Sequence, residues 1–336
     1  MPVRTPAAAA ALAAAALLLA ACGAGDGPAA ESAGEPAEPV TRTVTHAAGT
    51  TEVPTDPQRI VTTTDQNALL PLLELGVTPV GSAGLLDPAT GERSFRRTEG
   101  FDTSGVEFTG AYGEPNLEAV AALDPDLVVG YEFDEDFHDD LSAIAPTVLV
   151  QIFDRPLDEA LLEFGDLVGR GERAEELQAE HEARVEAIRT ELASRGELPS
   201  VSVITAGDPG QYYRADTGQA IGTVMDAVGL PRPDALLAAA PADEALSLER
   251  LAAAEADVVY VVDFTGDGQD PGFSTLVESP LYDRLAAVRA GQAHVVDGST
   301  TVGAAWARMG AFLDVLEETL VETEVDTAVV EGEVAG

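Results

Sequence analysis

Strand-like and helix-like segments alternate along most of this chain, and this alternation limits the folds that the chain can adopt. After a short hairpin near residues 44–53, apolar runs typical of buried strands alternate with helical segments: strands at 60–63, 80–83, 127–129 and 148–150, and helices at 68–75, 117–123 and 141–145. Strands joined by crossover helices lie parallel in one sheet, and the helices cover both of its faces. We therefore expect an α/β fold with mostly parallel sheets.

The same alternation returns after a long helical stretch, so the sequence predicts two lobes. Residues 157–193 have helical spacing, but Gly165, Gly169 and Gly171 predict a bend near 169–171. Strand and helix signals resume from residue 201. The expected divisions are an N-terminal lobe at 40–155, an inter-lobe long helix at 156–195, a C-terminal lobe at 196–323 and a frayed acidic tail at 324–336.

The N-terminal residues have the pattern of an export signal. Residues 1–21 combine Arg4, an apolar run and small residues, and Cys22, the only cysteine of the chain, follows directly. A cysteine after Leu-Ala-Ala resembles the bacterial lipobox, in which the chain is cut before a diacylated cysteine. We therefore expect a lipoprotein signal peptide at 1–21, lipidation of Cys22 and a flexible tether at 22–39. An ordinary signal peptide and a transmembrane anchor are the alternatives.

The chain is strongly acidic. Its 59 Asp and Glu residues outnumber its 18 basic residues, which are all arginine, and the formal net charge is −41. Such a field repels nucleic acids and anionic lipid headgroups. We therefore expect no nucleic-acid partner, and contact with the membrane through the lipid anchor only. A saline or an alkaline habitat would explain most of this acidity.

Two segments, one in each predicted lobe, repeat one pattern: a capping residue, Leu-Glu, a short helix, an Asp and an apolar strand. Asn116 and Ser247 begin the two segments and are good helix N-caps. Glu118 and Glu249 then stand in the first helical turn, where an acid suits the helix dipole. That local role is one interpretation. The repeat also fits a molecule that presents one carboxylate per lobe to a pseudo-symmetric partner.

Further pieces accompany these segments in a fixed order: VP at 53–54, PQRIV at 57–61, LLELGVTPVG at 72–81, IAPTV at 144–148 and SPLY at 279–282. Over residues 44–320 the chain resembles the periplasmic or surface-lipoprotein binding proteins of iron–siderophore, heme and cobalamin ABC importers. The resemblance implies two Rossmann-like α/β lobes joined by one long α-helix, with a ligand cleft between them and little closure. It also implies that Glu118 and Glu249 pair with arginines of the permease dimer, which works with its ATPase.

The resemblance places a ligand between the lobes, over the loops at strand ends. Aromatic and arginine side chains in these loops suit an anionic ferric siderophore, through stacking, cation–π contacts and charge-assisted hydrogen bonds. Core packing is the alternative for the aromatic residues, and a solvated loop for Arg97. Trp306, the only tryptophan, would report occupancy by its fluorescence. The predicted ligand-binding residues are Arg97, Tyr112, Tyr131, His138, Tyr212, Arg214, Trp306 and Arg308.

The sequence shows no pattern of a catalytic or metal site. The four histidines are not spaced as a metal pair, no Gly-rich phosphate loop follows a strand, and no nucleophile elbow occurs. The acidic turn at 263–270 lacks the spacing of a calcium-binding EF-hand. We therefore expect a monomeric binding protein without enzymatic activity, intrinsic cofactor or metal ligands.

The sequence thus predicts a lipid-anchored extracytoplasmic protein that captures a ferric siderophore and delivers it to an ABC importer permease through Glu118 and Glu249. Hydroxamate, catecholate and carboxylate siderophores all stay open. Heme, with His138, Tyr131 or Tyr212 as an axial ligand, and cobalamin are alternatives within the same family. An exported α/β hydrolase and a surface receptor without a permease are alternatives from other classes.

Overall fold

The computed structural model describes residues 40–153, 155–216, 219–239, 244–267 and 272–327. The expected signal peptide, the lipidation of Cys22 and the tether fall outside these ranges. Within them, no helix is both long enough and apolar enough to cross a membrane.

The N-terminal lobe is built on a sheet whose central strands are parallel. Its strand order is β7-β6-β4-β3-β8-β9, and β5 pairs with β4 off this path. Neighbours from β6 to β9 run parallel, whereas β5 and β7 are short antiparallel additions. All five residues of β8 are buried, as expected for a strand covered on both faces. The strands are β3 (Ile60–Thr62), β4 (Gly81–Leu86), β5 (Arg93–Ser94), β6 (Glu107–Ala111), β7 (Glu114–Pro115), β8 (Leu127–Tyr131) and β9 (Thr147–Val150).

Short helices and one hairpin complete this lobe. The hairpin of β1 (Thr41–His46) and β2 (Gly49–Pro54) is where the sequence predicts it, and it packs beside β9. The helical segments are the π-helix η1 (Asp65–Leu69), α1 (Leu70–Glu74), α2 (Leu117–Ala122), the 3-10 helix η2 (Glu132–Phe137) and α3 (His138–Ser142). The predicted alternation of strand and helix is confirmed here.

The C-terminal lobe has a second sheet, with strand order β12-β11-β10-β13-β14. β13 runs parallel to both β10 and β14, but β11 and β12 add to β10 as antiparallel strands. A tight turn at residues 207–210 reverses the chain between β10 and β11, and Gly210 takes a positive φ of 93° there. The strands are β10 (Val201–Ala206), β11 (Gln211–Arg214), β12 (Leu246–Ser247), β13 (Val258–Asp263) and β14 (Ala293–Asp297).

The C-terminal lobe contains ten helical segments among the described residues, most of them short. The helical segments on either side of Leu285 are separate, because the Glu255 carboxylate accepts hydrogen bonds from the backbone N–H groups of Ala286 and Ala287 and so starts a new helix. The helical segments are α6 (Gln219–Val228), α7 (Asp234–Ala239), η3 (Leu248–Ala254), η4 (Thr265–Asp267), α8 (Phe273–Val277), η5 (Tyr282–Arg284), α9 (Ala286–Ala290), α10 (Gly298–Thr301), α11 (Trp306–Leu316) and η6 (Glu317–Val321).

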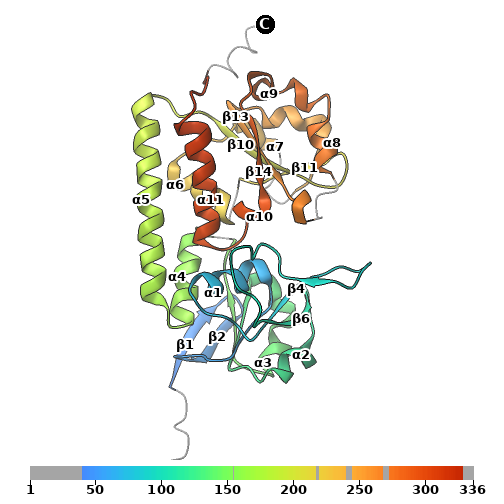
Figure 1. Cartoon of the computed structure of the whole chain (residues 1–336), viewed down its shortest axis with the longest axis vertical. Coiled ribbons are helices and arrows are strands. Elements are labelled where there is room, and N and C mark those ends of the chain that lie inside the picture. The colour runs from blue at the N-terminus through green and yellow to red at the C-terminus, as the bar shows by residue number, and fades with distance from the viewer. Residues whose placement is uncertain (1–39, 154, 217–218, 240–243, 268–271, 328–336) are drawn as a thin grey trace, which may run out of the picture. The chain divides into compact units, whose positions relative to one another are not determined.

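The expected single helix at 156–195 is instead two helices, α4 (Leu157–Leu167) and α5 (Gly171–Arg195). The break confirms the predicted bend, because Gly169 adopts a left-handed φ of 68° that interrupts the helix. Gly165 of α4 and Ala174 of α5 allow a close approach, since a Cβ at position 165 would lie 2.4 Å from the Ala174 Cβ. In Figure 1, α5 alone runs alongside both lobes.

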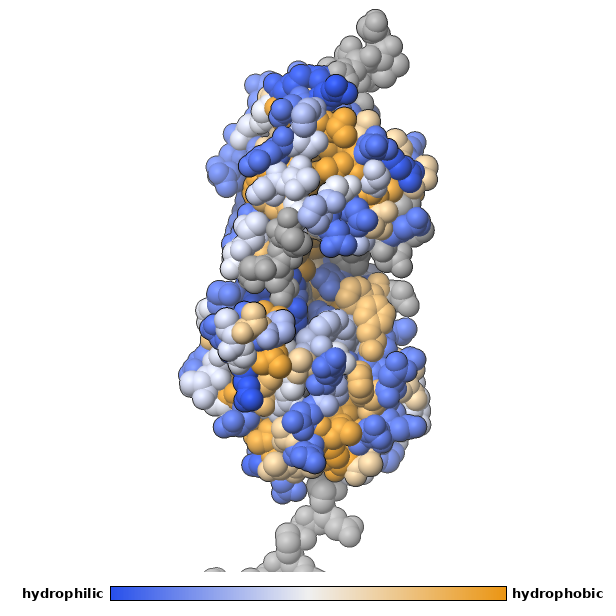
Figure 2. Space-filling model, turned by 90° about the vertical axis from the view of Figure 1, so that its right-hand side faces the viewer, coloured by the Kyte–Doolittle hydropathy of each residue, from blue (hydrophilic) through white to orange (hydrophobic). Residues whose placement is uncertain are grey.

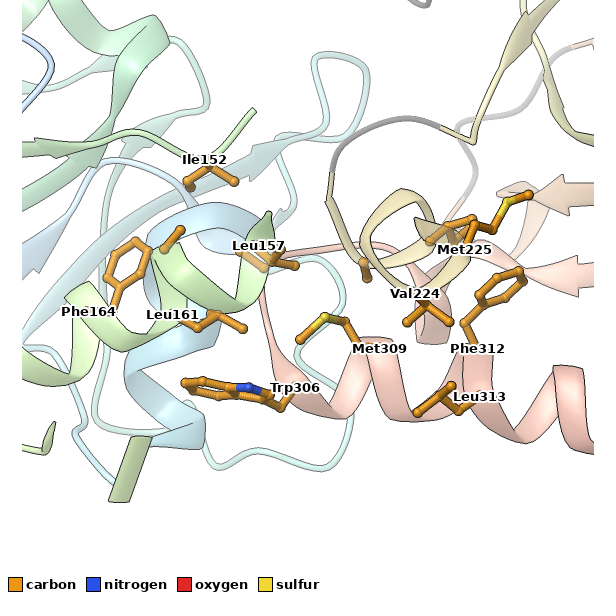
Figure 3. Close-up of a cluster of buried hydrophobic side chains, with 14 of the residues drawn as sticks. Ile152, Leu157, Leu161, Phe164, Val224, Met225, Trp306, Met309, Phe312 and Leu313 are labelled. Atoms are coloured by element: carbon orange, nitrogen blue, oxygen red, sulfur yellow. The ribbon is translucent and has the colours of Figure 1, made fainter. Parts of the chain in front are cut away.

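One apolar core continues from lobe to lobe. Figure 3 shows Trp306 and Met309 of α11 beside Leu161 of α4, with Val224 of α6 further along α11. The Glu74 carboxylate of α1 also accepts hydrogen bonds from the backbone N–H groups at the start of α11, 2.8 Å from Trp306 N and 2.6 Å from Ala307 N. These contacts join the lobes.

The start of the expected acidic tail is ordered rather than frayed. Val325 packs against the apolar core, and the Asp326 N–H donates to the Gln292 side chain at 2.7 Å. An apolar side chain and a paired backbone group hold this segment on the lobe. Residues 328–336 lie outside the described ranges.

Candidate functional site

An aromatic cluster lies at the carboxyl ends of β8 and β9. Tyr131 ends β8, Phe133 follows in η2 and Phe153 follows β9. The Phe133 ring stacks on Phe153 with centroids 5.0 Å apart, and it meets Tyr131 edge-on at 5.4 Å. The Phe133 side chain is 64% exposed, whereas Tyr131 is buried behind it, and burial raises the pKa of the Tyr131 hydroxyl. The cluster therefore presents a rigid aromatic surface to solvent.

An anchored arginine extends this surface. The Arg96 guanidinium bonds both carboxylate oxygens of the fully buried Asp65, at 2.8 and 3.0 Å. It also lies over the Tyr112 ring, 5.0 Å from the ring centroid. The Tyr112 hydroxyl hydrogen-bonds the Tyr131 hydroxyl and so connects the arginine to the aromatic cluster. A bidentate pair with a buried carboxylate fixes the orientation of a guanidinium.

Two further carboxylates hold the loops of the cluster. Asp134 accepts hydrogen bonds from the Thr63 hydroxyl at 2.5 Å and the Tyr131 N–H at 3.2 Å. Burial raises the pKa of this carboxyl. Glu132 accepts from the backbone N–H of Phe153 at 2.7 Å. The η2 turn is thereby tied to β3 on one side and to the loop after β9 on the other, which positions the exposed Phe133 between them.

The predicted residues Arg97 and Arg308 meet at a junction between the lobes. The Arg97 guanidinium lies 4.6 Å from the centroid of the Phe264 ring, which follows β13. The Arg308 guanidinium donates to the Arg97 carbonyl and lies 4.0 Å from the Glu99 carboxylate. Both arginines are largely buried. The structure therefore brings together two predicted residues from opposite lobes, in contacts that connect the lobes.

A second anchored arginine lies at the end of β11 in the C-terminal lobe. Arg214 bonds the fully buried Asp216 at 3.0 Å, and Arg232 contacts the same carboxylate at 2.9 Å. The neighbouring Tyr212 is 0% exposed, and its hydroxyl donates to the Arg250 carbonyl at 3.0 Å. Burial raises the pKa of Tyr212 to about 12. Tyr212 is therefore a core residue with no surface for a ligand.

His138 and Trp306 lie away from the aromatic cluster. The His138 ring contacts His46 of the N-terminal hairpin, with ring centroids 5.4 Å apart. Trp306 is 4% exposed and belongs to the apolar core in Figure 3. Apolar side chains of α4 and α11 pack against the indole, which fits the core-packing alternative for Trp306.

The residues that sequence reasoning left out of the predicted set are Arg96, Phe133 and Phe153. The sequence signal for Arg96 is its buried partner Asp65, which ends the polar run Thr-Thr-Thr-Asp at residues 62–65, at the end of β3. Phe133 follows the strand that carries Tyr131.

Figure 2 views the side toward which the β4–β5 hairpin projects, and hydrophobic patches there alternate with hydrophilic surface in both halves.

The repeated Leu-Glu segments have the predicted caps. The Asn116 side chain accepts from the Ala119 N–H at 3.1 Å, and Ser247 accepts from the Glu249 N–H at 3.3 Å. Glu118 and Glu249 are both exposed in the first turn, although the second segment is a 3-10 helix rather than an α-helix.

The arrangement suits binding of a planar or anionic molecule, through stacking and charge-assisted hydrogen bonds. Over the ranges that the structure describes, no group of three or more His, Cys, Asp or Glu residues could hold a metal ion.

A family model for periplasmic binding proteins matches residues 60–299. A Bacillus subtilis protein named "Probable siderophore-binding lipoprotein YfiY" is 30% identical over 274 residues, covering 76% of this chain and 80% of that protein. Staphylococcus aureus SirA, complexed with staphyloferrin B, superposes with a TM-score of 0.71 at 25% identity, covering 83% of this chain and 98% of that one.

The siderophore periplasmic binding protein from the fuscachelin gene cluster of Thermobifida fusca is 28% identical, with a TM-score of 0.64 over 81% of this chain and 99% of that one. These similar proteins are binding proteins rather than enzymes, which confirms the expectation from the sequence. The expected α/β fold with mostly parallel sheets and two lobes is also confirmed. The chain belongs to the periplasmic binding protein family.

Proposed function

We propose that this chain is a lipid-anchored extracytoplasmic protein that captures a ferric siderophore and delivers it to an ABC importer permease. The observation that carries the proposal is the exposed aromatic cluster beside an anchored arginine, at the strand ends of a periplasmic binding protein. Ferric siderophores of several classes are anionic and contain flat groups, so stacking and a guanidinium donor match their chemistry. The names of the similar proteins point to the same class of ligand.

The proposed binding surface differs from the predicted set. In the N-terminal lobe it comprises Arg96, Tyr112, Phe133 and Phe153, with Tyr131 as support. In the C-terminal lobe the polar contribution comes from Arg214, which the Asp216 carboxylate orients. Arg97 and Arg308 connect the lobes at their junction. Tyr212, His138 and Trp306 are left out, because their side chains are buried or contact other regions.

A calorimetric panel tests the ligand. The full chain is titrated with ferric hydroxamate, ferric catecholate and ferric citrate complexes, and with heme and cobalamin as the competing ligands. We expect submicromolar, saturable binding of one ferric siderophore class. Binding of heme or cobalamin alone would replace the proposed ligand, and binding of none would refute the proposed capture function.

The delivery step is proposed to use Glu118 and Glu249, which lie exposed in the first turn of a capped helix in each lobe. Exposed ion pairs are weak individually, but a pair across a two-lobed interface sets orientation. The double variant Glu118→Gln/Glu249→Gln should lose most siderophore-dependent iron uptake in cells while keeping its affinity for the siderophore.

Glu172→Gln is the matched control for this test, because Glu172 is also an exposed acid in the first turn of a helix. Uptake by the double variant equal to that of this control would show that the two glutamates do not dock the permease. The anchor is tested with Cys22→Ala, which should shift the protein from the membrane fraction to the soluble fraction.

A further inference from the structure

A groove separate from the proposed siderophore surface runs between α5, the start of α4 and α6. Its volume is about 870 Å³. The only member of the proposed siderophore surface that also lines this groove is Phe153, whose ring stands between the two regions. The groove is lined by residues 153, 155, 156 and 158 before and within α4, by 179–189 of α5 in part, and by 223, 226 and 227 of α6.

Two residues that line this groove each carry a buried polar atom without a hydrogen-bond partner among the described residues. These atoms are Oδ1 of Asp158, in the first turn of α4, and Nδ1 of His181, in the middle of α5. The His181 side chain is 7% exposed. Buried polar atoms in proteins are nearly always hydrogen-bonded, so these two atoms mark a place where a ligand group is favoured.

These two atoms would bind a ligand group that donates hydrogen bonds. An ionised carboxylate only accepts hydrogen bonds. Burial lowers the pKa of His181 against the opposing charge of Asp158, and the neutral imidazole accepts at Nδ1 when its proton is on Nε2. Two acceptors that face one groove suit a group with several N–H donors, such as an ammonium.

The remaining lining has the matching charge and polarity. Four acidic residues stand beside two arginines. Each arginine contacts a glutamate, Arg155 with Glu163 at 2.5 Å and Arg189 with Glu186 at 3.2 Å, so both positive charges are balanced by neighbouring carboxylates. Apolar walls are provided by Phe153, Pro156, Ala183 and Val185.

We propose that this groove binds a small organic ammonium ion with an apolar body, held between the Asp158 carboxylate and the His181 imidazole. The apolar body lies against the Phe153 side of the groove and the ammonium donates to the two buried acceptors. The site shares only Phe153 with the proposed siderophore surface.

The test is a calorimetric titration of the full chain with phenethylammonium chloride, compared with phenylacetate, which has a similar body and the opposite charge. We expect saturable one-to-one binding of phenethylammonium and none of phenylacetate. Asp158→Asn, which removes the charge and keeps the shape, should weaken phenethylammonium binding at least tenfold. Equal binding of both molecules, or no saturable binding of phenethylammonium, would overturn the proposal.

A pair of tryptophan substitutions on α5 localises the site. Ala183 lines the groove, whereas Ala187, one turn further along, is exposed and does not line it. Ala183→Trp should abolish phenethylammonium binding, and Ala187→Trp should leave it unchanged. Equal effects of the two variants would place the binding elsewhere. Neither variant should change the affinity for a ferric siderophore. The proposed groove can therefore be refuted without refuting the proposed siderophore surface, and the reverse.

Discussion

The strand ends of the two lobes use the same anchor and present different surfaces. Each lobe fixes an arginine on a fully buried aspartate, Arg96 on Asp65 in one lobe and Arg214 on Asp216 in the other. The N-terminal lobe adds an exposed aromatic ring, Phe133, whereas the C-terminal lobe buries its tyrosine, Tyr212. Under the proposed function, this difference assigns ligand stacking to the N-terminal lobe and mainly charge to the C-terminal lobe.

The largest expected effect comes from removing a buried anchor. Asp216→Ala should lower the free energy of unfolding by about 3–5 kcal/mol, because it takes the shared carboxylate from two largely buried guanidinium groups. Urea denaturation measures this loss. Asp226→Ala removes the exposed partner of Arg232 and should cost below about 1 kcal/mol. Equal losses would show that Asp216 is not the anchor of the C-terminal lobe.

Aromatic substitutions separate binding from stability in the two lobes. Phe133→Ala should weaken siderophore binding about fivefold, since one aromatic contact is worth about 1 kcal/mol, with little change in stability because the ring is exposed. Tyr212→Phe removes a buried hydrogen bond and should cost about 1 kcal/mol of stability with unchanged affinity. Calorimetry and denaturation measure both. The reversed pattern would exchange the roles assigned to the two lobes.

A pH-dependent effect is expected at Asp134, beneath the aromatic cluster. Its pKa in the folded state is raised above the ordinary 3.8 by burial, so the native state holds this proton more tightly than the unfolded state. The resulting stabilisation is fully present below pH 3.8 and is lost as the pH rises through the folded-state pKa. As the pH is lowered, the free energy of unfolding of the wild type should therefore rise relative to that of Asp134→Asn. A difference that is constant with pH would contradict this assignment.

The smallest effect concerns the single tryptophan. Because Trp306 is buried in the apolar core, adding a ferric siderophore should change the fluorescence of the wild type little. Phe133→Trp, which puts an indole in the aromatic cluster, should be quenched strongly and saturably. Strong quenching of the wild type and none of the added indole would place the ligand against α11 instead.

Much of the fold could be predicted from local patterns. The strands of the parallel core are continuous apolar runs, and the bend at Gly169 follows from a residue that favours a left-handed φ. Features set by distant contacts could not be predicted. The Glu255 carboxylate, which is distant in the sequence, starts a new helix at Ala286. The β10–β11 hairpin places Tyr212 in the core, and the sequence pattern around Tyr212 did not indicate which face of the strand is covered.

The candidate site was predicted in part for the same reason. Sequence patterns located the loops with aromatic and arginine residues, including Tyr112, Tyr131 and Arg214. These patterns did not show whether Arg96 or Arg97 belongs to the site. Arg96 is held by Asp65, which is distant from it in the sequence and comes close to it only in the folded sheet. Trp306 begins α11 and packs in the core between α4 and α11.

The most direct test of the central claim is the location of iron in crystals of the complex with the ferric siderophore that the panel identifies. Anomalous scattering from the iron fixes its position without any assumption about the ligand. We expect the iron on the side of Phe133 and Tyr112, with the siderophore stacked on the aromatic cluster and within reach of Arg96 and Arg214. Iron beside the α5–α6 groove, or on a surface away from the aromatic cluster, would contradict the account.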